Sequence, residues 1–174
     1  MTGFEEVVSQ QQRKVYSFAH YYLGSPEEAE DVTQEVFLKL WRHWQKIELP
    51  SVRPWLLRVT RNACFDRLRQ RRSMSRVIQP NVEPEIVESS PAQESDPETQ
   101  TQRAAFRRHV RQALEALSEP YRSVLILREI QGLRYREISD TLEMPLNTVR
   151  VNIHRGRRLL REELAGRYDS VSIA

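Results

Sequence analysis

The chain has 174 residues, of which 29% are charged and 39% hydrophobic, and its formal net charge at pH 7 is +3. This length accommodates one or two small domains. No apolar run approaches the length of about eighteen residues that a transmembrane helix needs, and the N-terminus lacks the pattern of a signal peptide. The single cysteine, Cys64, excludes an intramolecular disulfide and a metal site with several thiolates, so we expect a reducing, cytoplasmic location.

The charge is distributed unevenly along the chain. Residues 1–72 have a net charge of +3, residues 73–102 carry one basic and six acidic residues, and residues 103–174 have a net charge of +5. Two basic units therefore flank an acidic segment. Such an asymmetry favours a polyanionic partner.

Apolar residues at helical spacing predict a helix pair or one long helix over residues 4–23. Gly24 is well suited to end it. Ser25 then has the position of an N-cap, with Pro26 as the first helical residue and Glu28 completing a capping box.

The helix that follows is expected to run from Pro26 to about Trp44. Its inner stripe consists of Ala29, Val32, Val36 and Leu40. A second face, at i, i+3, i+4 and i+7, consists of Asp31, Gln34, Glu35 and Leu38. This second face suits a basic partner helix, but acidic residues near a helix start are also favoured by the helix dipole alone.

Pro50 and Pro54 are expected to bound a loop, with a third helix from about Trp55 into the basic tract Arg67–Arg72. The inward stripe of this helix consists of Leu56, Val59 and Ala63. Another face carries Arg58, Arg61, Asn62, Phe65, Arg69 and Arg72. A basic face with an amide and an aromatic ring suits single-stranded nucleic acid. A solvated helix with Phe65 in the core is the alternative interpretation.

Residues 73–102 hold four of the nine prolines, no glycine and no sustained apolar period, which predicts an extended acidic linker. Helical periodicity resumes at Ala105, and Ser118-Glu119-Pro120 begins a further helix that Gly132 ends. No strand pattern is longer than a few residues. We therefore predict an all-α chain with two small helical domains, residues 1–72 and 103–168, followed by a tail at 169–174.

Residues 133–164 indicate two helices around a short turn. The first carries Ile138 and Leu142 on one face, and Pro145 disfavours helical geometry at Met144. The second is expected to start within Pro145–Thr148, with Asn147 or Thr148 as a cap. Its inward stripe consists of Val149, Ile153, Leu160 and Leu164, and its opposite face of Arg150, Val151, His154, Arg155 and Arg158.

This pattern is typical of a helix-turn-helix whose second helix lies in a DNA major groove. A structural hairpin with a solvated arginine face is the alternative. Gly156 is unusual within such a helix, because a mid-helix glycine costs about 1 kcal/mol relative to alanine.

No residues form a constellation for catalysis or for a cofactor. His154 has no histidine at paired spacing, and Cys64 is expected to be a small core residue, with redox sensing as the alternative. Asp66, Asp140 and Ser118 belong to no acid–base or nucleophile arrangement, and there is no glycine-rich phosphate loop. We therefore expect a protein that is not an enzyme and needs no metal or other cofactor.

Residues 26–41, 55–72 and 116–160, in this order and spacing, closely resemble the extracytoplasmic-function (ECF) sigma factors of bacterial RNA polymerase. The resemblance implies a sigma-two domain and a helix-turn-helix sigma-four domain that together direct transcription initiation at specific promoters. It implies docking of the sigma-two domain on the β′ clamp helices of core polymerase through Asp31, Gln34, Glu35 and Leu38.

The same resemblance assigns promoter contacts. Capture of the melted −10 element falls to Arg58, Arg61 and Asn62, with the loop Glu48–Arg53 as a candidate pocket for a flipped base. Readout of the −35 duplex falls to Thr148, Arg150, Val151, His154, Arg155 and Arg158. Val151 departs from the small polar residue usual in the family, and contact with a thymine methyl group is our hypothesis. Gly156 and the short loop before Trp55 are further departures.

Further partners follow from the resemblance. They are the polymerase β flap, an anti-sigma protein that covers both domains, and a polymerase path suited to RNA, along which the acidic linker would be drawn out. Such proteins often serve stress responses. Two other classes remain open: a helix-turn-helix repressor, and an RNA-binding regulator that acts without polymerase.

Overall fold

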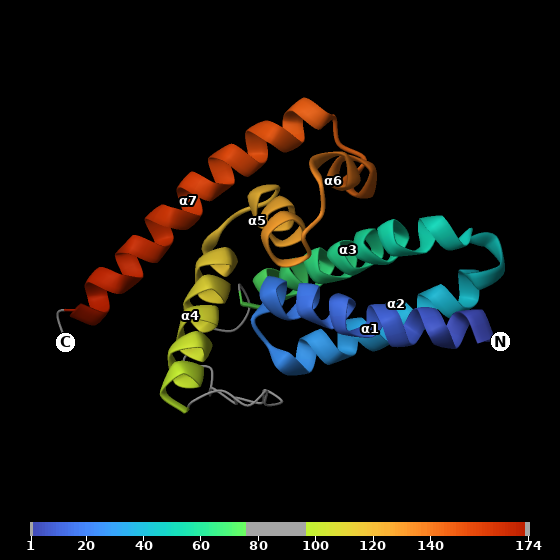
Figure 1. Ribbon diagram of the computed structural model, residues 1–174, viewed down its shortest axis with the longest axis horizontal. Coiled ribbons are helices and arrows are strands. Elements are labelled where there is room, and N and C mark those ends of the chain that lie inside the picture. Colours follow the sequence, from blue (N-terminus) through green and yellow to red (C-terminus); the bar gives the residue numbers. More distant parts are fainter. Residues whose placement is uncertain (1, 76–96, 173–174) are drawn as a thin grey trace.

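The computed structural model describes the backbone of residues 2–75 and 97–172, and the side chains of residues 3–75 and 99–167. Within these ranges every regular element is helical, which confirms the predicted all-α class (Figure 1). The central part of the predicted acidic linker, residues 76–96, and the last two residues of the predicted tail lie outside the described residues.

The N-terminal domain contains α1 (Thr2–Leu23), α2 (Pro26–His43), the short 3-10 helix η1 (Trp44–Lys46) and α3 (Leu49–Ser75). Residues 4–23 thus form part of one long helix, which ends at Gly24 in the left-handed region (φ 74°). The predicted inner stripe of α2 is confirmed, since its members are all fully buried: Ala29, Val32, Val36 and Leu40.

Of the capping box predicted for α2, only the hydrogen bond to the Ser25 side chain forms. Ser25 Oγ accepts a hydrogen bond from the backbone N–H of Glu28 at 3.3 Å. The Glu28 carboxylate does not complete a capping box, because it accepts from Arg71 Nε of α3 at 3.0 Å. Glu28 thereby ties the start of α2 to the end of α3.

The loop predicted between Pro50 and Pro54 is wrong, because α3 begins at Leu49 and includes both prolines. Pro50 lies in the first turn, where amide groups have no helical partner and proline is tolerated. Pro54 removes one backbone bond, and the buried side chains of Val52 and Leu56 hold the turn on the core. Most of the segment Glu48–Arg53 is therefore helix, so the expected flipped-base loop is absent from these residues.

The C-terminal domain contains α4 (Pro97–Ala116), α5 (Tyr121–Leu125), the π-helical turn η2 (Ile126–Ile130), α6 (Tyr135–Leu142) and α7 (Leu146–Ser172). The predicted linker is too long at both ends, since α3 reaches Ser75 and α4 begins at Pro97. The predicted tail is also helical up to Ser172. Proline favours the first position of a helix, and so Pro97 marks a start rather than a break.

The predicted turn between α6 and α7 is present, but neither of the two residues predicted to cap α7 lies at its N-cap position. Glu143 takes the left-handed conformation (φ 53°) after Leu142 and ends α6. Asn147 and Thr148 lie inside α7 rather than at its N-cap, because the helix already begins at Leu146. Pro145 precedes it and accepts the first helical bond, from Val149 N at 3.0 Å.

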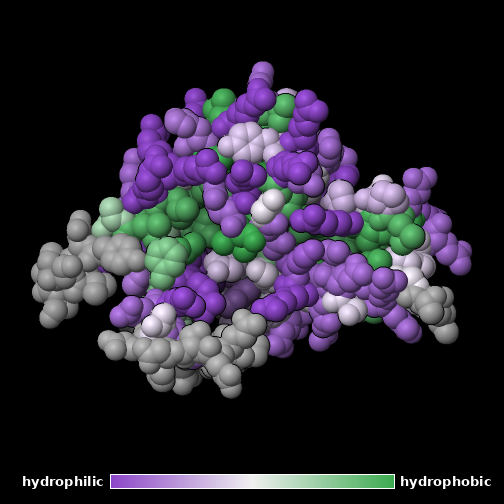
Figure 2. All heavy atoms as spheres, viewed as in Figure 1, coloured by the Kyte–Doolittle hydropathy of each residue, from purple (hydrophilic) through white to green (hydrophobic). Residues whose placement is uncertain are grey.

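The two domains lie against each other. In Figure 1, α5 and α6 lie between α3 and α7, and α4 stands beside α1. The buried apolar residues of both domains form one contiguous cluster. Most of the face shown in Figure 2 is hydrophilic, with hydrophobic residues in separate patches.

Candidate nucleic-acid interface

The second helix of the helix-turn-helix, α7, has one buried side and one exposed side. Val149 and Ile153 are buried against the domain core. The six residues predicted for −35 readout are all exposed, and we call them the recognition face: Thr148, Arg150, Val151, His154, Arg155 and Arg158. Val151 is 45% exposed, so its apolar side chain is accessible to a partner.

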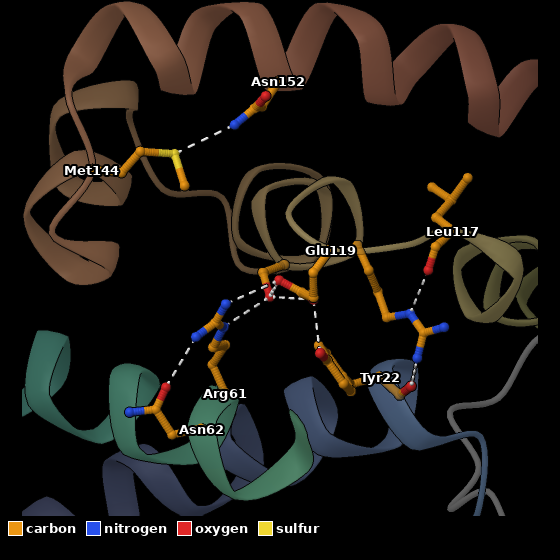
Figure 3. Close-up of polar contacts among 9 residues, drawn as sticks. Tyr22, Arg61, Asn62, Leu117, Glu119, Met144 and Asn152 are labelled. Carbon is orange, nitrogen blue, oxygen red and sulfur yellow. Dashed lines mark hydrogen bonds and ion pairs between the residues drawn. The ribbon is translucent and has the colours of Figure 1, made fainter. Parts of the chain in front are cut away.

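Two contacts fix the position of α7 on its domain. The Asn152 side chain, only 7% exposed, donates from Nδ2 to the sulfur of Met144 in the preceding turn at 3.4 Å (Figure 3). A Cβ atom on Gly156 would lie 3.2 Å from Leu125 of α5. Gly156 therefore permits close packing of α7 on α5. This packing explains the glycine without any contact to DNA.

The charges on the recognition face are largely uncommitted. Arg150 donates to Asn147 at 3.4 Å, and Arg158 lies 3.8 Å from Glu162 with both side chains about two-thirds exposed. Arg157, by contrast, pairs with Glu129 at 2.6 Å, a contact that raises the pKa of Arg157. Arg157 is thus engaged within its own domain, whereas the arginines of the recognition face point to solvent.

The three residues predicted for −10 capture lie together on α3, but two of them are engaged. Arg58 Nη1 donates to Glu143 Oε1 at 2.5 Å, and Arg61 Nη2 lies 3.2 Å from Glu119 Oε2. Asn62 is exposed and accepts from Arg61 Nη1 at 3.1 Å (Figure 3). Both carboxylates belong to the C-terminal domain, so this part of α3 faces the other domain.

The predicted docking face on α2 is accessible. Asp31 and Gln34 are exposed, Glu35 is half-buried, and Leu38 is 59% exposed. Asp31 pairs with Arg67 of α3 at 3.3 Å, and Glu35 with Lys39 at 2.6 Å. The four residues therefore lie on one accessible face of α2, whose two carboxylates each pair with a basic side chain.

The sequence interpretation missed Trp41, which is 56% exposed and lies three residues after Leu38 on α2. Its ring meets Phe4 edge-on at 5.0 Å between centroids, and Phe4 also meets Trp44 at 5.2 Å. The i, i+3 spacing from Leu38 is the signal that could have found it. Trp41 extends the apolar part of the docking face.

A second missed group lies between the domains. Arg122 is 5% exposed, donates to the backbone oxygens of Leu117 and Tyr22 at 3.1 Å each, and also donates to the backbone oxygen of Glu115. Its guanidinium lies 5.0 Å from the centre of the Tyr22 ring. Burial lowers the pKa of Arg122, and burial beside Glu119 raises the pKa of Tyr22. Tyr22 belongs to the apolar period of residues 4–23, but no sequence period marks Arg122.

The remaining candidate groups lie apart from these surfaces. Cys64 is fully buried, as predicted, and burial raises the pKa of its thiol. Among the described residues no group of His, Cys, Asp or Glu side chains is arranged to hold a metal ion. None of the described helices has the length and apolar character needed to cross a membrane.

Family models match both domains of this chain. The model of sigma-70 region 2 matches residues 7–74, and a model of sigma-70 region 4 matches residues 100–160. The predicted domains at residues 1–72 and 103–168 approximate these two matches.

Curated relatives match nearly the whole chain. The ECF RNA polymerase sigma factor SigE of Mycolicibacterium smegmatis is 35% identical over 95% of this chain, which spans 63% of that relative's length. The ECF RNA polymerase sigma-E factor of Escherichia coli is 33% identical over 91% of this chain and 84% of its own length.

A solved structure has the same fold. The sigma factor RpoE of Bartonella quintana, solved in complex with the anti-sigma factor NepR, has a TM-score of 0.74 and 23% identity, covering 95% of this chain and 98% of that one. The order of the helices, the two region matches and the identity to relatives agree. The chain belongs to the ECF sigma factors of RNA polymerase, which direct promoter-specific initiation of transcription.

Proposed function

We propose that this sigma factor works through three separate surfaces: the recognition face for −35 duplex DNA, the α3 residues for the melted −10 strand, and the docking face for core polymerase. The observation that carries the proposal is the recognition face itself. All six of its side chains are exposed along one side of α7, while Val149 and Ile153 on the other side are buried.

The position of each residue along α7 suggests its role. Arg150 and Val151 lie near the start of the helix, the part that reaches base edges in helix-turn-helix complexes. Arginine suits the O6 and N7 atoms of guanine, and an exposed valine suits a thymine methyl group. Arg155 and Arg158, further along the helix, suit phosphates, which position the protein without reading sequence.

The −10 element is bound as a single strand. Asn62 offers an amide to exposed base edges, and Arg58 and Arg61 offer charge to the strand's phosphates. Base pairs must be opened first, at a cost of a few kcal/mol per flipped base. Contacts that exist only on the melted strand offset that cost and therefore favour opening at the correct site.

Docking on polymerase uses the acidic face around Leu38, extended by Trp41. Exposed apolar residues ringed by charge are typical of an interface centre. The clamp helices of the β′ subunit are the proposed partner of this face, and the β flap that of the C-terminal domain. An anti-sigma protein that covers these surfaces would keep the sigma factor inactive. The sigma factor RpoE of Bartonella quintana was solved in complex with an anti-sigma factor, NepR.

The proposal includes no catalytic step by this chain, because bond formation belongs to the polymerase. It also places the protein in the bacterial cytoplasm, where promoter DNA and polymerase are found. The observation that supports both points is the match of each domain to a sigma-70 region.

Site-specific photo-crosslinking in the holoenzyme tests the assignment of the surfaces. A photoreactive amino acid at Val151 should crosslink to the −35 duplex, and one at Asn62 to the non-template strand of the −10 element. The same group at Phe106, an exposed residue of α4, serves as the control position. Crosslinks from Val151 to the −10 strand, or from Asn62 only to duplex DNA, would contradict the assignment.

A further inference from the structure

A polar network joins the two domains at Glu119. Arg61 Nη2 of α3 lies 3.2 Å from Glu119 Oε2, and Tyr22 of α1 donates its hydroxyl to Glu119 Oε1 at 2.7 Å (Figure 3). Ser123 donates to the same carboxylate at 2.7 Å and lies within 3.4 Å of Arg61 Nε. One carboxylate of the C-terminal domain thus gathers donors from two helices of the N-terminal domain.

A second contact lies further along α3. Arg58 Nη1 donates to Glu143 Oε1 at 2.5 Å, and Glu143 belongs to the turn of the helix-turn-helix. Gln131 of the C-terminal domain also donates to the backbone oxygen of Lys14 in α1 at 3.0 Å. The contacts between domains therefore occupy both arginines that the proposed function assigns to the −10 strand.

The two ion pairs differ in their exposure to solvent. The side chains of Arg61 and Glu119 are 29% and 18% exposed, whereas those of Arg58 and Glu143 are 36% and 71% exposed. Solvent screens an exposed pair strongly, and such pairs contribute little to stability. The Glu119 network, with three donors in a less exposed site, is therefore the stronger of the two ion-pair contacts between the domains.

This arrangement is incompatible with binding both promoter elements. The −35 and −10 elements lie about two helical turns apart, or roughly 70 Å. In the structure Arg58 contacts Glu143, and Arg150 follows Glu143 by only seven positions, a stretch of at most ~25 Å even if fully extended. The two readers are far too close together, so the domains must separate before both contact DNA.

We propose that the contact between domains is an intramolecular brake: Glu119, supported by Glu143, occupies the −10 arginines with carboxylates in place of the DNA strand and keeps the free sigma factor closed. The promoter strand opens it by competing for the same arginines, and core polymerase opens it by holding the two domains apart on its β′ clamp helices and its β flap. The closed state itself follows from the geometry. The conclusion that this state prevents Arg58 and Arg61 from binding the −10 strand rests on the proposed function.

Energy transfer between two dyes on the full-length chain measures the closure directly. Cysteines introduced at Ser51 and Asp140, both exposed, place the dyes within about two helical turns of the Arg58–Glu143 contact. Cys64 is fully buried and does not compete for the label. We expect high transfer in the free protein, and a shift to low transfer when core polymerase is added.

The variant E119Q removes the charge that gathers the donors but keeps the shape of the side chain. We expect its open fraction to be roughly tenfold larger than in the wild type, because a charge-assisted contact is lost. Y22F, which removes one donor from the other domain, should shift the open fraction in the same direction and by less. The matched control is E129Q, whose carboxylate pairs with Arg157 within one domain. It should leave the transfer unchanged.

Run-off transcription with core polymerase supplies the functional readout. If only the open form binds polymerase, apparent affinity scales with the open fraction, so E119Q should reach half-maximal transcription at roughly tenfold less polymerase. Low transfer in the free wild type, or E119Q and Y22F that behave like E129Q, overturns the brake. Failure of every variant, including the wild type, to support transcription instead refutes the proposed function and leaves the transfer result standing.

Discussion

Gly156 of α7 and Leu125 of α5 are in direct contact, and a Cβ atom on Gly156 would lie 3.2 Å from both Cγ and Cδ1 of Leu125. Leu125 is fully buried, so its side chain is held on all sides by the core. An added methyl group would therefore force Leu125 to shift, so Gly156 suits the close packing of the recognition helix, although glycine weakens a helix on its own.

The variant G156A should lower the stability of the protein. Overpacking in a core costs about 1–3 kcal/mol, and the better helix propensity of alanine returns about 1 kcal/mol, so we expect a net loss of about 1 kcal/mol. Thermal unfolding measures it. The matched control is G166A in the same helix, where nothing lies within 4 Å of the added atom, and which should be neutral or stabilising. Equal effects of the two substitutions would contradict this explanation.

Replacing residues of the recognition face should separate sequence readout from general DNA affinity. R150A should weaken holoenzyme binding by about 1–3 kcal/mol and relax the preference at one −35 base pair. R158A should weaken binding to all sequences alike and reduce its salt dependence. Competition binding with −35 sequence variants at several salt concentrations distinguishes the two. A uniform loss for R150A would remove it from base readout.

The docking face should tolerate replacement without loss of folding. Leu38 is 59% exposed, so L38D leaves the core intact, but it places a charge at the centre of the proposed interface. We expect at least roughly tenfold weaker binding to core polymerase. M74D, at the exposed end of α3, is the matched control and should bind normally. Normal polymerase binding by L38D would show that the docking face lies elsewhere.

His20 should make the stability depend on pH below neutrality. Burial, followed by the charge of Arg111, lowers its pKa from about 6.5 to about 4. The unfolded chain therefore binds a proton between pH 6.5 and pH 4 that the folded chain does not, and stability falls as the pH is lowered through this range. The difference between wild type and H20Q should correspond to about one proton in denaturant titrations. H43Q, at an exposed histidine, is the control, and a slope that H20Q leaves unchanged would contradict this origin.

Much of the architecture could be predicted from the sequence, because helices carry local signals. The stripe with Val149 and Ile153 predicted the buried side of α7, and the residues between its members predicted the recognition face. Gly24 marked a helix end for the same local reason, since it adopts a positive φ angle.

The errors arose where tertiary contacts outweigh local signals. Pro50 and Pro54 indicated a loop, but buried Val52 and Leu56 hold that segment on the core as a helix. Glu119 is separated from Arg61 by 58 positions. The sequence pattern placed Glu119 at the start of a helix and Arg61 on a nucleic-acid-binding face, with nothing to connect the two. A contact between residues so distant in sequence leaves no periodic trace, so the association of the two domains could not be predicted.

We propose that this chain directs polymerase to promoters through two separate DNA contacts. Run-off transcription with core polymerase on a library of randomised promoters tests this mechanism most directly. We predict transcripts only when the chain is present, from templates enriched in two elements about two helical turns apart, with R150A altering preference only in the upstream one. Transcription that does not depend on the chain, or enrichment of a single element that R150A leaves unchanged, would contradict the account.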